Sequence, residues 1–322
     1  MHHLIKTVIY SLLATCTPCH TFIYRIDALR PIDKQQPLVM CLSDFHDKTH
    51  PETHPQQAYV NNLLNQLVKK NAYVLVEDLS SPNTQTGLTG CGSFSVDSRG
   101  GILGGLSATC KQKNIPVENV EYRFCRVAAF GPVLNHPNQS LNSLESAKRI
   151  NIDAIYAEIK QAIERIQQFS DGPDLQKQYA QAIDHVLNEL IDLHLSGKSH
   201  ASIADYLTQQ TNSVVRPNTL KRLLTFDSGL LDMSFVHGVL QAHDKNIIVI
   251  IAGGAHISNV CELLEKNGYK RIYNTPVAYI QEHNLNGCIG SRIIDENYCV
   301  KPQAVDLHAI DQFIDTTPSA NQ

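Results

Sequence analysis

Three apolar runs, each the length of a β-strand, end in side chains that can do chemistry. His46 follows the first run, Glu77 the second and His256 the third; the runs span residues 38–43, 72–76 and 247–252. A histidine can move a proton near neutral pH or bind a metal, and a neighbouring carboxylate sets its tautomer and basicity. Because strand ends meet at one edge of an open α/β sheet, we expect these side chains to share a pocket there.

Residues next to these strand ends can complete the pocket. Asp44 and His46 would point to the same face of a strand that continues beyond the first apolar run, because side chains alternate. Gly253 and Gly254 would let the backbone turn tightly and approach a substrate. Asp47 is a further candidate for substrate binding at the first strand end.

Arg123 follows a fourth expected strand, at 117–122. Its guanidinium could hold an anionic substrate or orient a carboxylate, and we include it among the substrate-binding candidates. A surface salt bridge is the commoner role of a lone arginine, so both readings stay open.

Two ways of activating water fit these residues. With a divalent metal such as Mn, Zn or Fe, two histidines (His46 and His256) plus Glu77 or Asp44 would leave one coordination position for water. Without a metal, His46 could act as a general base on water, with Glu77 or Asp44 orienting it. We therefore predict a hydrolase-like protein acting on a small-molecule or peptide substrate. The alternatives are a non-catalytic pocket that binds a ligand, and histidines that only cap buried strands.

The composition limits the other classes. At 322 residues, with 43% hydrophobic and 18% charged residues, the chain can form one large α/β domain with an insertion or two domains. The net charge of -4 and the lack of a basic stripe give no reason to expect nucleic acid as a partner. Nine scattered cysteines, an odd number, argue against a disulfide scaffold. Nothing in the sequence indicates an oligomeric state.

The first 22 residues resemble a targeting leader. Lys6 precedes an apolar stretch at 7–14, and Leu13-Ala-Thr-Cys16 is similar to a lipoprotein cleavage site. We expect export, as a periplasmic, secreted or lipoprotein form, with the membrane contacted only through this leader. The alternative is a cytoplasmic protein with an apolar first helix. No later run of about 18 apolar residues predicts a membrane span.

The remaining pattern predicts an α/β fold: a mainly parallel central sheet flanked by helices, with a helical insertion. The N-terminal half (30–142) carries a helix at 56–70, a loop at 80–105 and a short helix ending at 114. Helical periodicity from 143 to 243 predicts an insertion that caps the sheet, or a helical arm for dimerisation. The C-terminal half (244–306) has a strand at 247–251, a helix at 258–267 and a strand at 270–273. A polar tail, 307–322, is expected to be disordered.

Two motifs resemble known families. Ser43-Asp44-Phe45-His46-Asp47 is similar to the Gly-Glu-x-His-Asp segment of ChaN-like and erythromycin-esterase-like proteins. Gly253-Gly254-Ala255-His256, with residues 263–269, resembles the Gly-x-x-His and Leu-x-x-x-Gly-Tyr segment of TraB and Tiki proteins.

The superfamily that joins these families includes esterases acting through an activated water, metal-dependent proteases and haem-iron-binding lipoproteins. The resemblance implies a sheet with helices on both sides and carries over His46, Glu77 and His256 as site residues. It also implies that the ligand of the non-catalytic alternative would be haem, iron or another ligand. Ser43 stands in place of a family glycine. Asp44 stands in place of a family glutamate, and its side chain is shorter by one methylene group.

Overall fold

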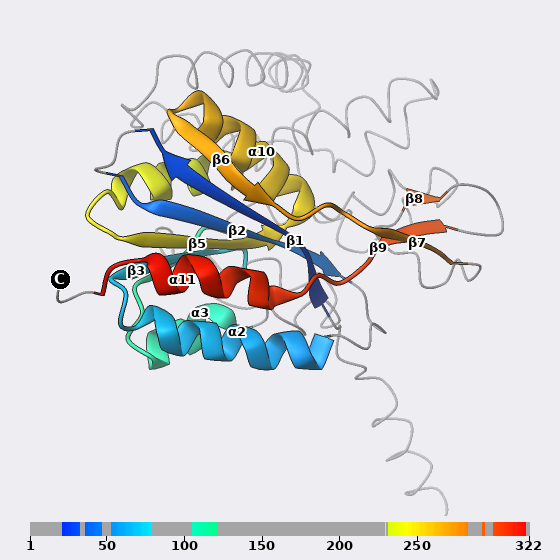
Figure 1. Cartoon of the computed structure of the whole chain (residues 1–322), viewed down its shortest axis with the longest axis horizontal. Helices are drawn as coiled ribbons and strands as arrows, with labels where there is room; N and C mark the ends of the chain where they lie inside the picture. Colours follow the sequence, from blue (N-terminus) through cyan, green and yellow to red (C-terminus); the bar gives the residue numbers. More distant parts are fainter. Residues whose placement is uncertain are drawn as a thin grey trace, which may run out of the picture.

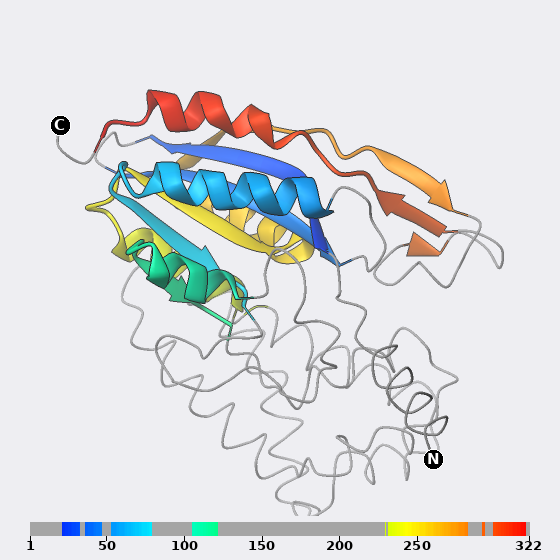
Figure 2. The same cartoon turned by 90° about the horizontal axis from the view of Figure 1, so that it is seen from below.

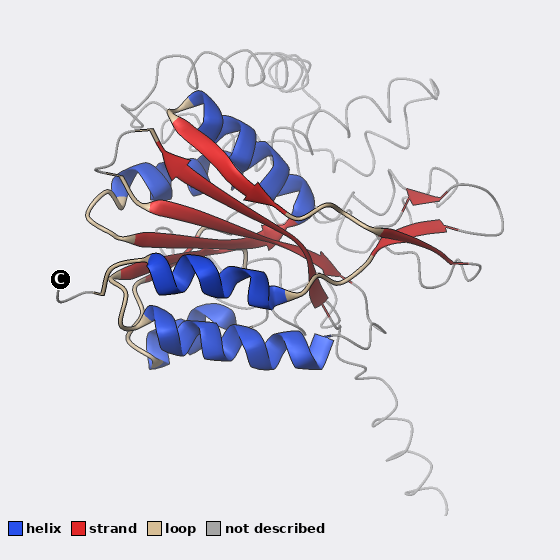
Figure 3. Ribbon diagram, in the orientation of Figure 1, coloured by secondary structure: helices blue, strands red, loops and turns tan. Residues whose placement is uncertain are grey.

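The computed structural model describes residues 21–32, 36–46, 53–78, 105–121, 229, 231–282, 292–293 and 299–319. These ranges form a six-stranded sheet with helices on both faces, and a separate three-stranded sheet (Figures 1 and 3). None of the helices in these ranges combines the length and the apolar character needed to cross a membrane.

The large sheet is mixed and mostly parallel. Its spatial order is β4-β3-β5-β2-β1-β6, with bounds β1 Thr21–Pro31, β2 Leu38–His46, β3 Ala72–Val76, β4 Val117–Asn119, β5 Ile247–Gly253 and β6 Tyr269–Asn274. β4, β3, β5 and β2 pair in parallel, and β1 is antiparallel to both of its neighbours. β5 is apolar at every position up to Ala252 and buried over that whole length, as expected for a central strand covered on both faces.

Helices cover both faces of this sheet (Figures 1 and 2), and each layer packs on it through a cluster of buried apolar residues. On one face lie α2 (Thr53–Leu67), α3 (Leu106–Gln112), the 3-10 helix η6 (Leu307–Ile310) and α11 (Asp311–Thr316). On the other face lie the helix at 231–241 and α10 (Gly254–Lys266). We call these the α2 face and the α10 face.

The sequence accounts for the bounds of α10. It starts at two glycines and ends with Asn267 as its C-cap, followed by Gly268 at φ 87°. This is the expected Asn-Gly stop signal, since glycine adopts the left-handed conformation without a β-carbon clash. The apolar stripe of α10 packs on the sheet through Ile257, Val260, Cys261 and Leu264.

The small sheet is antiparallel and was not predicted. Its order is β7-β9-β8, formed by β7 Tyr279–Glu282, β8 Arg292–Ile293 and β9 Cys299–Pro302 (Figure 1). The chain leaves β9 and enters η6.

Most predicted elements of the α/β core are confirmed within one to a few residues, but one strand was missed and one expectation is wrong. β1 was not predicted, and it starts inside the interval assigned to the leader. The tail from 307 is not disordered up to residue 319, because Leu307, Ile310, Phe313 and Ile314 are buried on the α2 face. Residues 1–20, and the predicted insertion apart from 229 and 231–243, lie outside the described residues.

α11 is held to α2 by a hydrogen bond that Tyr59 Oη donates to Asp311 Oδ1. This bond is the main cause that holds the pKa of Asp311 below its ordinary value of 3.8, and a second bond from His308 acts the same way. Because the folded-state pKa is lowered, the stability it contributes is present above that ordinary value and is lost as the pH falls through the folded-state pKa.

Tyr59→Phe is therefore expected to raise the pKa of Asp311 and to lower stability at neutral pH. The loss should be under about 1 kcal/mol, because the carboxylate is partly exposed, and it should shrink in acid. Carboxyl-carbon NMR titration and urea unfolding at two pH values measure both effects. Tyr73→Phe, which removes a phenol bonded to Glu118, is the matched control. An unchanged Asp311 titration in Tyr59→Phe would contradict the assignment.

Candidate functional site

The candidate site lies where β2, β5 and β3 end side by side. Asp44 pairs with Gly253, and Glu77 N donates to Ile251 O at 3.1 Å, so the three strands reach the same edge. β2 and β3 lead into helices on the α2 face, whereas β5 leads into α10 on the other face. Such a reversal of crossover direction opens a crevice at the carboxyl ends of the strands, where open α/β sheets bind ligands.

Gly253 lies at the centre of this edge. A β-carbon built there would be 3.3 Å from Glu77 Oε2 and 3.7 Å from His256 Cδ2. The carboxylate and the imidazole therefore converge on the space that the missing side chain leaves. Asp44 is the register partner of Gly253, and paired residues of parallel strands point to the same side, about 4.8 Å apart. The structure thus brings Glu77 and His256 together at this edge. Asp44 lies beside them in the register, but its partner in β1, Ile23, packs on the α2 face, so the Asp44 side chain points to that face.

Glu77 is held firmly in this position. Its Oε2 accepts a 2.7 Å hydrogen bond from Gly253 N, and its side chain is buried. The next residue, Asp78, is fixed by the Asn119 side chain, which accepts from Asp78 N at 3.0 Å and donates to Asp78 O at 2.9 Å. β4 therefore braces the end of β3 from which Glu77 projects.

His256 is oriented by a carboxylate that the sequence analysis missed. Its Nδ1 lies 2.6 Å from Asp232 Oδ1, and both side chains are buried. Asp232 Oδ2 accepts a further 2.8 Å bond from Asn259 Nδ2, one helical turn beyond His256. Asp232 comes from the helix at 231–241, whose neighbours Leu231, Phe235 and Val236 pack on the α10 face.

This contact decides the tautomer of His256. An ionised carboxylate only accepts hydrogen bonds, so Nδ1 carries the proton and Nε2 keeps its lone pair. Cδ2, which is bonded to Nε2, is the ring atom nearest to the Gly253 position. The ring therefore approaches the Gly253 position with Cδ2, an atom next to Nε2 and not bonded to Nδ1.

The other predicted site residues are less completely described. β2 ends at His46, whose backbone pairs with Thr21, and the side chain of His46 lies outside the described residues. Asp47 and Arg123 also lie outside them. Gly254, the first residue of α10, is covered by the phenol of Tyr24. The missing side chain of Gly254 therefore makes room for Tyr24, whereas the sequence suggested that it would make room for a substrate.

The donor set suits a metal only in part. Within the described ranges, no three His, Cys, Asp or Glu side chains are grouped so that they could hold a metal ion. The pair formed by Asp232 and His256 does match the carboxylate–histidine arrangement found behind metal ligands.

We expect Gly253→Ala to separate the fold from the chemistry. Gly253 has φ -56° and ψ 142°, which alanine adopts without strain, so unfolding should change little. The added methyl group would lie between Glu77 and His256, and turnover should fall about 10- to 100-fold. Thermal unfolding and kcat measure the two effects. Full activity in a folded Gly253→Ala would show that the reaction does not use this space.

Comparisons of the chain with protein-family models, with curated proteins and with solved structures found no match.

Proposed function

We propose that the chain is a hydrolase in which His256 is the general base. In this mechanism Nε2 takes a proton from a water, and the hydroxide adds to the electrophilic carbon of an ester or amide. The bond between that carbon and the ester oxygen or amide nitrogen then breaks, and His256 returns the proton to the leaving group. The observation that carries the proposal is the 2.6 Å contact between His256 Nδ1 and Asp232 Oδ1, because it sets the tautomer that leaves Nε2 basic.

Asp232 and Glu77 have different roles in this proposal. Asp232 touches the protonated side of the ring, so it stabilises the imidazolium that forms during proton transfer. The Glu77 carboxylate and the Cδ2 atom of His256 both lie next to the Gly253 position, and Glu77 accepts from the Gly253 backbone. From there its carboxylate can orient the attacking water. Asp44 adds negative charge at the same strand edge and, with Glu77, disfavours an anionic substrate.

A metal-assisted form of the same reaction is the second candidate. It is supported by the Asp232–His256 pair, which would raise the basicity of a ligating imidazole. Nε2 of His256 and the Glu77 carboxylate would be ligands, together with His46 as the sequence predicts. A bound Mn, Zn or Fe ion would supply a water of lowered pKa.

The deciding experiment is a turnover assay on the full chain with p-nitrophenyl acetate, p-nitrophenyl butyrate and an alanine p-nitroanilide peptide. Each is run on untreated protein, after EDTA, and after adding back Mn, Zn or Fe. Turnover that survives EDTA supports water activation by His256 alone, and turnover lost to EDTA and restored by one metal supports the metal form. No turnover with any probe, together with a haem absorbance shift on titration with haemin, would favour the ligand-binding alternative.

A further inference from the structure

A β-bulge in β1 turns two consecutive side chains, Tyr24 and Arg25, toward α10. Ile23 pairs with Asp44 and Arg25 pairs with Ser43, so Tyr24 is an extra residue in the register. Ile23, before the bulge, and Ile26, after it, both pack on the α2 face. In a regular strand, residues 24 and 25 would face opposite sides, so the bulge is what directs both of them to the α10 face.

Tyr24 contacts the start of α10. Its phenol covers Gly254 so closely that a β-carbon on this residue would overlap the ring. Phe45 packs edge-on against Tyr24, with 6.0 Å between ring centroids. The strand can approach the helix this closely because Gly254 has no side chain.

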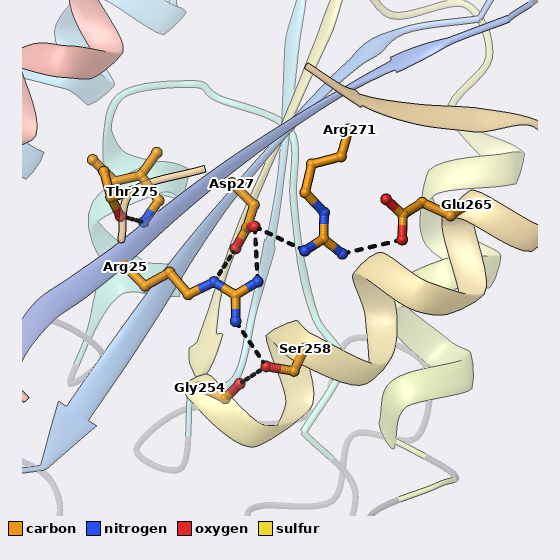
Figure 4. Close-up of polar contacts among 8 residues, drawn as sticks. Arg25, Asp27, Gly254, Ser258, Glu265, Arg271 and Thr275 are labelled. Atoms are coloured by element: carbon orange, nitrogen blue, oxygen red, sulfur yellow. Dashed lines mark hydrogen bonds and ion pairs between the residues drawn. The ribbon is translucent and has the colours of Figure 1, made fainter. Parts of the chain in front are cut away.

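Arg25 contacts the end of the same helical turn (Figure 4). Its Nη1 donates to Ser258 Oγ at 3.1 Å, and that hydroxyl donates to Gly254 O at 3.1 Å. The guanidinium is itself held by Asp27, through a 2.9 Å bond from Nη2 to Oδ1 and a 2.7 Å ion-pair contact between Nε and Oδ2. Burial disfavours its charged form, but the contacts with Asp27 outweigh burial and raise the pKa of Arg25.

These contacts hold the turn that carries His256. Gly254 and Ser258 are one turn apart and therefore lie on the same side of α10, toward β1. His256 lies between them in sequence and projects to the other side, where it meets Asp232. The first turn of α10 is thus held between β1 and the helix at 231–241.

We propose that Tyr24 and Arg25 are positioning residues, placed by the bulge, that fix the first turn of α10 and so hold the His256 imidazole on Asp232. Their catalytic importance rests on the proposed function. Their effect on the imidazole does not, because it can be observed without a substrate.

The test uses Ser258→Ala, which removes the hydroxyl that links Arg25 to Gly254 O. Thr109→Val is the matched control, since Thr109 Oγ1 also bonds a carbonyl four residues back, Gly105 O at 3.1 Å, on the α2 face. Arg25→Lys is a second variant. It keeps the positive charge beside Asp27, but an ammonium group cannot reproduce the guanidinium geometry that reaches Asp27 and Ser258 at the same time. Each full-length variant is examined by NMR for the His256 Nδ1 proton and by kcat and KM on the ester probes.

The proposal expects the Nδ1 proton signal to persist in wild type and Thr109→Val. In Ser258→Ala and Arg25→Lys it should exchange away, with kcat about 10- to 100-fold lower and KM unchanged. A wild-type signal and kcat in Ser258→Ala would overturn it, as would equal losses in Thr109→Val. If wild type hydrolyses none of the probes, the proton signal alone decides the positioning role, and only the proposed function fails.

Discussion

Replacing His256 with asparagine is expected to lower kcat by about 10³-fold or more while the chain stays folded. Asparagine places an amide N–H where His256 has Nδ1, so the bond to Asp232 can persist, and it has no equivalent of Nε2. Alanine would be a poorer choice, because it leaves the buried Asp232 carboxylate with one fewer donor, at a cost of about 1–3 kcal/mol.

Asp232→Asn tests the same pair from the other side. An amide can donate to Nδ1 and so favour the tautomer with the proton on Nε2, which should reduce kcat by about 10³- to 10⁴-fold. The ring nitrogen chemical shifts of His256 report the tautomer directly.

The chain offers a matched control for both variants. His308 Nδ1 lies 3.0 Å from Asp311 Oδ2, a second histidine–carboxylate pair, but it is exposed and belongs to η6 on the α2 face, whereas Asp232 and His256 lie on the α10 face. His308→Ala should leave turnover unchanged, which guards against hydrolysis of activated esters by surface imidazoles. Wild-type kcat in His256→Asn would remove His256 from the mechanism.

Asp27→Ala is expected to give the largest loss of stability, about 3 kcal/mol. Asp27 is fully buried in β1 and accepts contacts from two cations, with Arg25 as above and Arg271 Nη1 at 3.5 Å (Figure 4). Removing one partner of a buried ion pair costs about 3–5 kcal/mol, and the partial exposure of both arginines places this site at the lower end.

Glu265→Ala is the control for this prediction. Glu265 is at the exposed end of the same network, 3.2 Å from Arg271 Nη2, so its loss should cost under about 1 kcal/mol. Urea unfolding of the full-length variants compares the two. A loss for Asp27→Ala as small as that for Glu265→Ala would show that the arginines are adequately solvated without their partner.

The parts of the fold that the sequence predicts well are those with uninterrupted local patterns. β5 and α10 were recognised from an apolar run and from the Asn267-Gly268 stop. β1 was missed because the bulge at Tyr24 shifts its alternation by one residue and because an apolar N-terminus suggested a leader. α11 was missed because its sequence is mostly polar. The apolar residues that it packs on the sheet, Phe313 and Ile314, are too few to make the segment look hydrophobic.

The same distinction applies to the candidate site. Glu77 and His256 were found because each follows a strand, and the structure brings these two together. Asp232 gave no such signal: it is one acidic residue in a helix, and only the packing of that helix on α10 brings it to His256. Tyr24 and Arg25 depend on the register of a strand that was not predicted. The roles of His46, Asp47 and Arg123 stay predictions.

The place of β5 between β2 and β3 has a consequence for how the chain folds. Leu38 and Ala72 both pair with Ile247, so two strands formed early in synthesis find their shared partner only when the C-terminal region has been made. Such long-range pairing gives a high contact order, and folding should be slow compared with proteins of local topology. Until β5 inserts, β2 and β3 each expose an unpaired edge next to apolar surface. A ribosome-bound chain that stops before residue 247 should therefore depend on chaperones and be sensitive to protease.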